Sequence, residues 1–308
     1  MRALAPPGGG CPTDTAACGR VGVRHPPHCP PMHTLRWSPW CRFEDDPRAE
    51  IPAAPGLYRV RHDTDIADGL TYIGESSDIR RRIGSLVRGT RAERMPYRDP
   101  HTAAPCLWAI RHRDGPGFSV SHTTLASEDV AERKGIEAAL IAIHRHETGR
   151  SPTAQFGRII PGYTQSSYRR DGVRGGPAPD ESADEGPASV QPRPWTWWER
   201  PQIRAWMAQG WAPQHPIDVV DLAELPQVGV YRIYESSGDA LTYIGQSKAL
   251  PDRLRTHMRR FGSGVWVSWA GRDDLRTQAA RLEVETDLIG AYVCAEGRPP
   301  AAQFRRGG

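Results

Sequence analysis

Residues 229–257 read GVYRIYESSGDALTYIGQSKALPDRLRTH, and this stretch holds the pattern that decides the fold. Two short apolar runs each carry a tyrosine close to a glycine, Tyr231 in the first run and Tyr243 in the second. Between them, residues 236–239 are Ser, Ser, Gly and Asp, which are typical of a turn. The stretch therefore predicts a β-hairpin with one tyrosine on each strand.

The residues that follow the hairpin predict a helix. Its apolar positions recur at helical spacing, and they are Leu250, Leu254 and Met258. Ser247 is a plausible N-cap, and Pro251 suits the first turn. Arg253 and His257 are four residues apart, so they share one face of the helix. Hairpin and helix together would gather two phenols, a guanidinium and an imidazole.

This combination of residues resembles the GIY-YIG nuclease family. The family pattern implies a tyrosine on each of the first two strands, an arginine and often a histidine on the next helix, and a metal-binding glutamate on a later helix. The positions that match it here are Tyr231, Tyr243, Arg253, His257 and Glu285. The family usually ends with an asparagine, and this chain has Gln303 in that place.

A second copy of the same pattern lies upstream, so the chain contains an internal repeat. The matching residues of this first copy are Tyr58, Tyr72, Arg82 and Glu137. Both copies have glutamine at the final position, as Gln155 and Gln303. The first copy has Leu86 where the second has His257, and it carries a basic insertion at residues 88–105. Both halves therefore resemble the family, and the second half keeps the fuller set of residues.

The repeat predicts an α/β fold of the α+β type, with two tandem modules that each hold a small three-stranded antiparallel sheet flanked by helices. We expect the first domain at residues 37–160 and the second at residues 195–308. Residues 161–194 are rich in Gly, Pro, Ser and acidic residues, which is typical of a flexible linker. Residues 1–36 are expected to be disordered.

Two alternatives stay open for the beginning of the chain. Residues 1–31 contain several possible zinc ligands, which are Cys11, Cys18, Cys29, His25 and His28. They include no CxxC pair, which structural zinc sites commonly have. Translation that begins at Met32 would remove the stretch altogether.

The net charge of +4 does not identify a nucleic-acid-binding protein by itself, but the distribution of basic residues does favour one. They gather beside both tyrosine motifs, and the candidate DNA contacts are Arg80, Arg81, Arg88, Arg91, Arg94, Arg98, Arg255, Arg259 and Arg260. No apolar run reaches the roughly 18 residues that span a bilayer. We therefore expect a cytoplasmic protein with reduced thiols, DNA as its partner and no membrane association.

Local patterns predict several further elements. Residues 106–110, CLWAI, are expected to form a strand of the first copy, the counterpart of residues 265–269, VWVSW, in the second. Residues 127–147 predict a helix capped by Ser127. Residues 199–216 predict a short helix packed on the second repeat.

Tryptophans precede the hairpin of each copy. They are Trp37 and Trp40 in the first copy, and Trp195, Trp197 and Trp198 in the second. One interpretation is a platform on which bases stack. The other is a lid of aromatic rings that closes each small core, and we favour the lid.

Phosphodiester hydrolysis needs an activated water, neutralisation of charge on the phosphate and help for the leaving oxygen. By the resemblance, Glu285 and Glu137 would hold a divalent metal such as Mg²⁺, with waters and substrate oxygens completing its shell. Arg253 would bind a phosphate oxygen through its planar fork of donors. The hairpin tyrosines would orient the attacking water or accept its proton, helped by a nearby cation, and His257 could relay protons.

Three hypotheses follow from the sequence. The first is a metal-dependent DNA endonuclease in which the second copy cleaves and the first mainly grips DNA. The second is a non-catalytic or partly degenerate nucleic-acid-binding protein, suggested by the glutamines at the asparagine position and by Leu86. The third is an interaction module whose repeats serve only as packing units.

Overall fold

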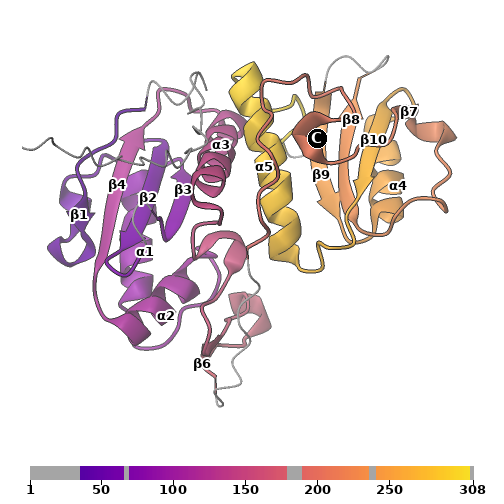
Figure 1. Cartoon of the computed structure of the whole chain (residues 1–308). Coiled ribbons are helices and arrows are strands. Elements are labelled where there is room, and N and C mark those ends of the chain that lie inside the picture. Colours follow the sequence, from indigo (N-terminus) through magenta and orange to yellow (C-terminus); the bar gives the residue numbers. More distant parts are fainter. Residues whose placement is uncertain (1–34, 66–68, 179–188, 236–240, 306–308) are drawn as a thin grey trace, which may run out of the picture.

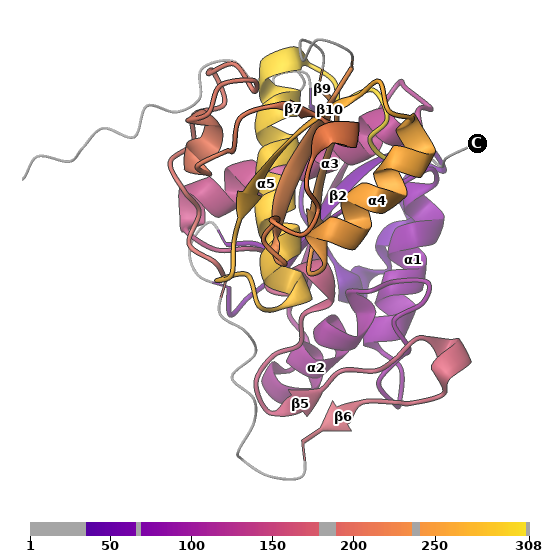
Figure 2. The ribbon, with the colours of Figure 1, turned by 90° about the vertical axis from the view of Figure 1, so that its right-hand side faces the viewer.

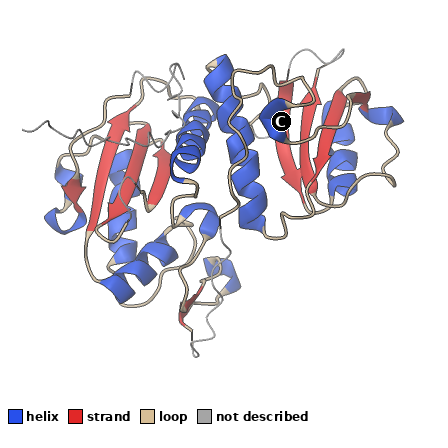
Figure 3. Ribbon diagram, viewed as in Figure 1, coloured by secondary structure: helices blue, strands red, loops and turns tan. Residues whose placement is uncertain are grey.

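The computed structural model describes residues 35–65, 69–178, 189–235 and 241–305. The predictions for residues 1–34, including the zinc alternative, lie outside the described residues. Figure 1 shows two antiparallel sheets, one in each half of the chain, with α3 and α5 packed side by side between them. The α+β class expected from the sequence is confirmed, and Figure 3 shows the helices and strands of both halves.

The first repeat contains a four-stranded antiparallel sheet in the order β1-β4-β2-β3. Its strands are β1 (Cys41–Arg42), β2 (Gly56–His62), β3 (Tyr72–Ser76) and β4 (Phe118–Thr124). Its helices are α1 (Ile79–Thr90), α2 (Ala104–Asp114) and α3 (Val130–Thr148). The expected hairpin is β2 and β3, whereas the third strand is β4 and not the expected residues 106–110. The short β1 extends the sheet at the edge formed by β4.

The second repeat has the same sheet order, β7-β10-β8-β9, and its strands are again antiparallel. Its strands are β7 (His215–Pro216), β8 (Gly229–Tyr234), β9 (Leu241–Ser247) and β10 (Trp266–Gly271). Its helices are α4 (Leu250–Phe261) and α5 (Gln278–Glu296). The hairpin and the helix that follows it are therefore confirmed in both repeats.

Short elements connect these parts of the chain. They are the 3₁₀ turns Phe43–Asp45, Pro47–Ala49, Gln155–Gly157, Arg169–Asp171, Trp206–Ala208 and Ile217–Val219, and the strand pair β5 (Tyr163–Thr164) and β6 (Gly176–Pro177). The 3₁₀ turn Arg169–Asp171 and the strands β5 and β6 lie within residues 161–194, the segment expected to be a flexible linker. At its far end Val190 donates its N–H to Glu283 at 2.8 Å. Both ends of that segment are thus attached to folded parts of the protein.

The strand predicted at residues 106–110 is wrong, because these residues lie in α2. A short apolar run fits a buried strand and a buried helix equally well. Pro105 lies in the first turn of the helix, where its missing N–H costs no hydrogen bond, and Trp108 Nε1 donates to Ala92 O at 2.8 Å. The true counterpart of β10 is β4, and α2 begins at the end of the basic insertion.

The other predicted helices need smaller corrections. No α-helix forms within residues 199–216, where the chain makes a 3₁₀ turn at 206–208 and then the short strand β7. The helix of the first repeat begins at Val130, and Asp129 caps it by accepting the N–H of Ala131 at 2.8 Å, in place of Ser127. Similarly, α4 has Ala249 at its N-cap, while Ser247 Oγ accepts the N–H of that residue.

The faces of each sheet have different neighbours. Tyr58 on β2 packs with Ile83 of α1, and Tyr231 on β8 packs with Leu254 of α4. Figure 2 shows α4 and α5 on opposite sides of the second sheet. On the α5 side, Trp206 joins the buried core. The tyrosine motifs therefore face the α1 or α4 side, and the tryptophan segments lie on the other.

The two repeats meet where α3 crosses α5. A Cβ atom at Gly290 of α5 would come within 3.0 Å of Ala142 Cβ, so the missing side chain lets the helices approach closely. Beside this contact Arg145 of α3 forms ion pairs with Glu283 and Asp287 of α5, at 2.9 and 2.8 Å. The interface thus combines small residues with a buried cluster of charges.

Candidate active site

Tyr231 lies across the glycine at the end of the YIG triplet. Tyr231 on β8 and Gly245 on β9 are partners in the sheet register, and a Cβ at Gly245 would come within 3.0 Å of the phenol oxygen. Tyr58 and Gly74 have the same relationship in the first repeat. The glycine is required because any side chain would displace the phenol.

His257 completes an aromatic cluster with the two tyrosines of the second repeat. Its Nε2 lies 2.7 Å from Tyr231 Oη, and its ring centroid lies 5.1 Å from that of Tyr243. Burial, then the charges of Arg253 and Arg260, lower the pKa of His257 to about 4. The imidazole is therefore neutral at pH 7 and can accept a proton through Nε2 or Nδ1, according to its tautomer.

The tyrosines are weaker bases than the sequence suggested. Burial raises the pKa of Tyr231 well above its usual range, and Arg253 lowers it by less than burial raises it. The pKa of Tyr243 is raised for the same reason, and the two phenols are hydrogen-bonded to each other. Without a metal ion, the phenols act as hydrogen-bond donors and orienting groups at neutral pH, because Arg253 alone does not make them basic.

Glu285 is the carboxylate of the second site. It accepts a hydrogen bond from the backbone N–H of Gln246, directly after the YIG triplet, and it lies in the field of Arg253. Burial outweighs both effects and raises its pKa to about 8. Glu137 of the first repeat accepts the corresponding N–H of Glu75, and burial, followed by the charge of Glu75, raises its pKa to about 8.

These carboxylates fit a divalent cation that is held by one protein ligand. A buried carboxylate without enough positive charge around it gains most from a bound cation, and Mg²⁺ keeps several waters in its shell. Within the described residues no group of three or more His, Cys, Asp or Glu could hold a metal ion. The remaining positions would therefore belong to water and substrate oxygens, as the resemblance implies.

Both candidate metal ligands open onto one cavity between the repeats. Its volume is about 450 Å³, and it lies where α3 and α5 meet. Its lining includes Glu137, Gln155, Tyr243, Arg260, Glu285 and Gln303. The two glutamates thus share a groove, although they belong to separate tyrosine motifs.

The site of the first repeat differs around its arginine. Arg82 donates to Pro100 O at 2.9 Å and lies 2.8 Å from His101 Nδ1, both in the insertion. By contrast, the guanidinium of Arg253 makes no hydrogen bond within the parts of the chain that the structure describes. Leu86, at the position of His257, is fully buried beside Tyr58. The first site therefore lacks the imidazole, and its guanidinium is partly engaged.

The glutamines at the family's asparagine position close the open edges of the two sheets. Gln155 Oε1 accepts the N–H of Ile73 on β3 at 3.3 Å, and Gln303 Oε1 accepts the N–H of Ile244 on β9 at 3.0 Å. β3 and β9 are edge strands, so these N–H groups have no partner strand. The glutamines therefore have a structural role that sequence reasoning did not assign.

Sequence reasoning also missed two buried arginines that hold α3 and α5 on the hairpins. Arg133 Nε donates to Glu75 Oε2 at 3.1 Å, and Arg281 Nε donates to Gln246 Oε1 at 3.1 Å. Each arginine lies four residues before the candidate metal ligand of its repeat. This matched spacing was a signal in the sequence that could have identified them. They position the helices that carry Glu137 and Glu285.

The predicted DNA contacts fall into two groups. Most are exposed, and a cavity of about 280 Å³ is lined by Arg81, Arg82 and Arg88, with His101 beside them. Five of the arginines also contact other protein groups. Arg80 donates to Ile51 O, Arg91 donates to Phe43 O, and Arg255 forms an ion pair with Asp252. Arg98 and Arg260 lie over the rings of Tyr168 and Tyr243. Arg94 and Arg259 are exposed. The basic insertion thus presents its free arginines close to the first tyrosine motif.

Two observations concern the whole chain. Among the described residues, no helix is long and apolar enough to cross a membrane. Comparison of the chain with protein-family models, curated proteins and solved structures finds no match in any of the three. The likeness to the GIY-YIG pattern therefore depends on the residues that this chain itself brings together: two phenols, an imidazole, a guanidinium and a buried carboxylate.

Proposed function

We propose that the chain is a metal-dependent DNA endonuclease built from two GIY-YIG-like modules, with Mg²⁺ as the cofactor. The observation that carries the proposal is Glu285, a carboxylate with a pKa raised to about 8, in the field of Arg253 and beside the Tyr231–His257 pair. Perturbed groups that differ in chemistry and lie close together are characteristic of catalytic sites, and Glu285 and Tyr243 of this group line the cavity between the repeats.

Each side chain has a role that its environment supports. Arg253 binds the non-bridging oxygens of the scissile phosphate, because its guanidinium edge is not committed to a hydrogen bond within the described chain. Tyr231 and Tyr243 orient the attacking water. With its own proton on Nδ1, His257 accepts through Nε2 the proton that Tyr231 Oη passes on from that water. A divalent cation on Glu285 would neutralise phosphate charge and lower the pKa of a bound water.

A second function is favoured for the first repeat. Arg82 is engaged by Pro100 and His101, and Leu86 replaces the histidine. The cavity beside Arg82 is basic. We therefore propose that the first repeat mainly binds DNA, and that the whole protein acts in the cytoplasm. If neither site cleaves, the chain is a nucleic-acid-binding protein built on the same modules.

Nicking of supercoiled plasmid with and without Mg²⁺ tests the proposal. Glu285→Gln and Glu137→Gln form a matched pair, since each removes one buried carboxylate at an equivalent position. We expect Glu285→Gln to abolish nicking while DNA binding persists, and Glu137→Gln to leave most activity. The reverse result would reassign the cleaving copy, and equal partial losses would make both repeats nucleases. Absence of nicking by the unmodified chain with Mg²⁺ or Mn²⁺ would reject the nuclease.

A further inference from the structure

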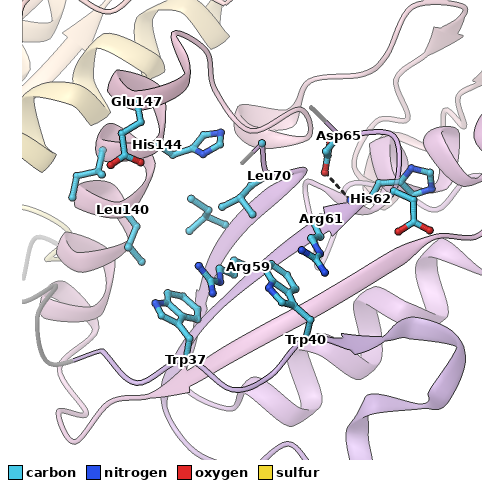
Figure 4. Close-up of a pocket in the computed structure, with 14 residues that line it drawn as sticks. Trp37, Trp40, Arg59, Arg61, His62, Asp65, Leu70, Leu140, His144 and Glu147 are labelled. Atoms are coloured by element: carbon cyan, nitrogen blue, oxygen red, sulfur yellow. Dashed lines mark hydrogen bonds between the residues drawn. The ribbon is translucent and has the colours of Figure 1, made fainter. Parts of the chain in front are cut away.

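A cavity lies on the face of the first sheet opposite the tyrosine motif. It has a volume of about 670 Å³, within the range of pockets that bind small molecules. Figure 4 shows Trp37, Trp40, Arg59 and Arg61 along one side of it, with His144 and Glu147 of α3 across from them. No role in the proposed cleavage reaction involves this pocket.

Two arginines in this pocket rest on tryptophan rings. The guanidinium carbon of Arg59 lies 4.4 Å from the centroid of Trp37 and 4.8 Å from that of Trp40, and Arg61 lies 4.4 Å from Trp40. Stacking uses the flat face of a guanidinium and leaves its edge donors available. The Nε of Arg59 is buried and has no hydrogen-bond partner in the described structure. Arg59 and Arg61 therefore present N–H donors to the pocket that an acceptor on a ligand could bind.

The carboxylates that line the pocket do not neutralise these arginines. Asp63 pairs with Arg42 at 2.7 Å, and Asp65 accepts from Thr71 Oγ1 at 2.8 Å. The pKa of Arg59 is lowered first by burial and next by the neighbouring charge of Arg61. Two like charges thus stand together in a half-buried pocket, an arrangement that a bound anion would stabilise.

The second repeat shows the same position in a closed form. Arg232 occupies the place of Arg59, one residue after the first motif tyrosine. It is fully buried, lies 3.9 Å from the ring centroid of Trp211, and donates to Ser268 Oγ at 3.1 Å and to Pro201 O. Here Trp211, which is not one of the tryptophans predicted to form a lid, covers the guanidinium, and protein oxygens accept from its terminal nitrogens. The Nε of Arg232 is buried without a partner, as in Arg59. In the first repeat Trp37 and Trp40 line an open cavity.

We propose that this pocket binds one nucleotide unit, with its phosphate on the guanidinium edges of Arg59 and Arg61 and its base against the indoles of Trp37 and Trp40. Guanidinium groups bind phosphate oxygens in bidentate fashion, and aromatic side chains stack bases without regard to sequence. The unit comes either from a free nucleotide or from a single strand of nucleic acid. The second source rests on the proposed function, and it would hold a strand away from the cleavage site.

Fluorescence anisotropy with the full chain in EDTA tests this without any need for cleavage. The probes are a labelled single-stranded oligonucleotide, a duplex of equal length, deoxyadenosine monophosphate as competitor and orthophosphate as competitor. The test variant is Arg59→Gln/Arg61→Gln. The control is Arg200→Gln/Arg276→Gln, which removes two exposed arginines elsewhere. Thermal melts check folding, and Arg61→Gln alone and Trp40→Leu provide further variants if the double variant does not fold.

We expect the test variant to weaken single-strand binding about tenfold and the control to change it little. The slope of log affinity against log salt should fall by about 0.7, as for the loss of one phosphate contact on a single strand. The mononucleotide should compete better than orthophosphate, and Trp40→Leu should remove that advantage. If only the oligonucleotide binds, the source is a strand. If the mononucleotide also binds tightly, it is a free nucleotide.

Three results would overturn the inference. They are unchanged affinity in folded variants, displacement of the oligonucleotide by orthophosphate as strongly as by the nucleotide, and an effect restricted to the duplex. If the chain binds the mononucleotide through Arg59 but never nicks plasmid, the nucleotide pocket stands and only the proposed nuclease activity is rejected. If the chain nicks plasmid but the Arg59 variant binds every probe normally, the nuclease stands and the nucleotide pocket is rejected.

Discussion

Arg145 of α3 donates two hydrogen bonds to Asp287 of α5, from Nε to Oδ1 at 2.8 Å and from a terminal nitrogen to Oδ2 at 3.2 Å. Glu283 lies 2.9 Å from the same guanidinium, and the side chains of Arg145 and Glu283 are 0% exposed. Residues from the two repeats therefore meet in one buried cluster. A repeat that swung away would leave these charges unpaired, so the repeats are coupled in stability.

Arg145→Leu should destabilise the whole chain by about 3–5 kcal/mol, because it leaves Asp287 buried without its cation and leaves Glu283 with Arg158 alone, at 2.6 Å. Denaturant unfolding followed by tryptophan fluorescence measures this, and both repeats should unfold in one transition. Arg150→Leu, at an exposed position of the same helix end, is the control and should change stability little. After proteolytic cleavage within residues 179–188, the two fragments should still elute together. Fragments that separate, with two independent transitions, would show that the repeats are autonomous domains.

The free energy of unfolding should fall as pH rises from about 6.5 to 8 when no metal is present. The unfolded Glu285 loses its proton near pH 4.5 but the folded residue only near 8, since burial raises its pKa. Between these values the folded state holds more protons, and each such carboxyl contributes a fall of up to about 1.4 kcal/mol per pH unit. The loss of stability from ionising Glu285 is therefore absent below pH 4.5 and complete above pH 8. Buried His257, with its pKa lowered to about 4, reduces stability only below pH 6.5.

Melts at pH 6.5, 7, 7.5 and 8 on the unmodified chain and on Glu285→Gln check this slope, which should be shallower in the variant. Added Mg²⁺ should raise stability most at pH 8, since the cation binds the ionised carboxylate. Two results would place the metal elsewhere. One is stabilisation by Mg²⁺ that is the same at all pH values, and the other is stabilisation of the Glu285→Gln/Glu137→Gln double variant that equals that of the unmodified chain.

His257→Leu should lower the rate of nicking while leaving the fold intact. The first repeat already carries a fully buried leucine at this position, so the second repeat can accommodate one. A positioned acid–base group contributes typically about 10²–10⁴-fold to a rate. Single-turnover cleavage and a thermal melt measure the two effects. If the rate is unchanged, His257 has no part in the reaction, and the proposed proton transfer from Tyr231 to His257 is rejected.

Gln303→Asn should lower stability, although asparagine is the residue that the family pattern has there. The shorter side chain cannot reach the N–H of Ile244, which Gln303 Oε1 accepts at 3.0 Å, and an unpaired buried N–H costs about 1–3 kcal/mol. Gln155→Asn should behave alike, because Gln155 accepts the N–H of Ile73. Denaturant midpoints measure both. A neutral result in both repeats would mean that the edge strand finds another acceptor.

Local patterns predicted the parts of the fold that depend on neighbours in sequence. The hairpins, α1 and α4 follow from turn residues and helical spacing, so Tyr231, Tyr243 and His257 are brought together as expected. α2 was mistaken for a strand because a short apolar run carries no period. The acceptors for Ile73 and Ile244 lie 82 and 59 residues away, and Arg145 and Asp287 are 142 apart, so no local pattern could join them.

The contact between α3 and α5 also bears on how such a chain could have arisen. Counted from the matching glutamates, Arg145 corresponds to Val293, and Asp287 corresponds to Ala139. The ion pair therefore exists on one side only, and its mirror position holds an apolar pair. A symmetric pair of identical chains would form such a contact twice, since each chain brings the same residues to both sides, whereas this chain forms it once. If a duplicated gene began as a symmetric pair of subunits, the two fused copies have since diverged at this contact. Neither copy alone could now form the ion pair with an identical partner, because each carries only one of its two residues.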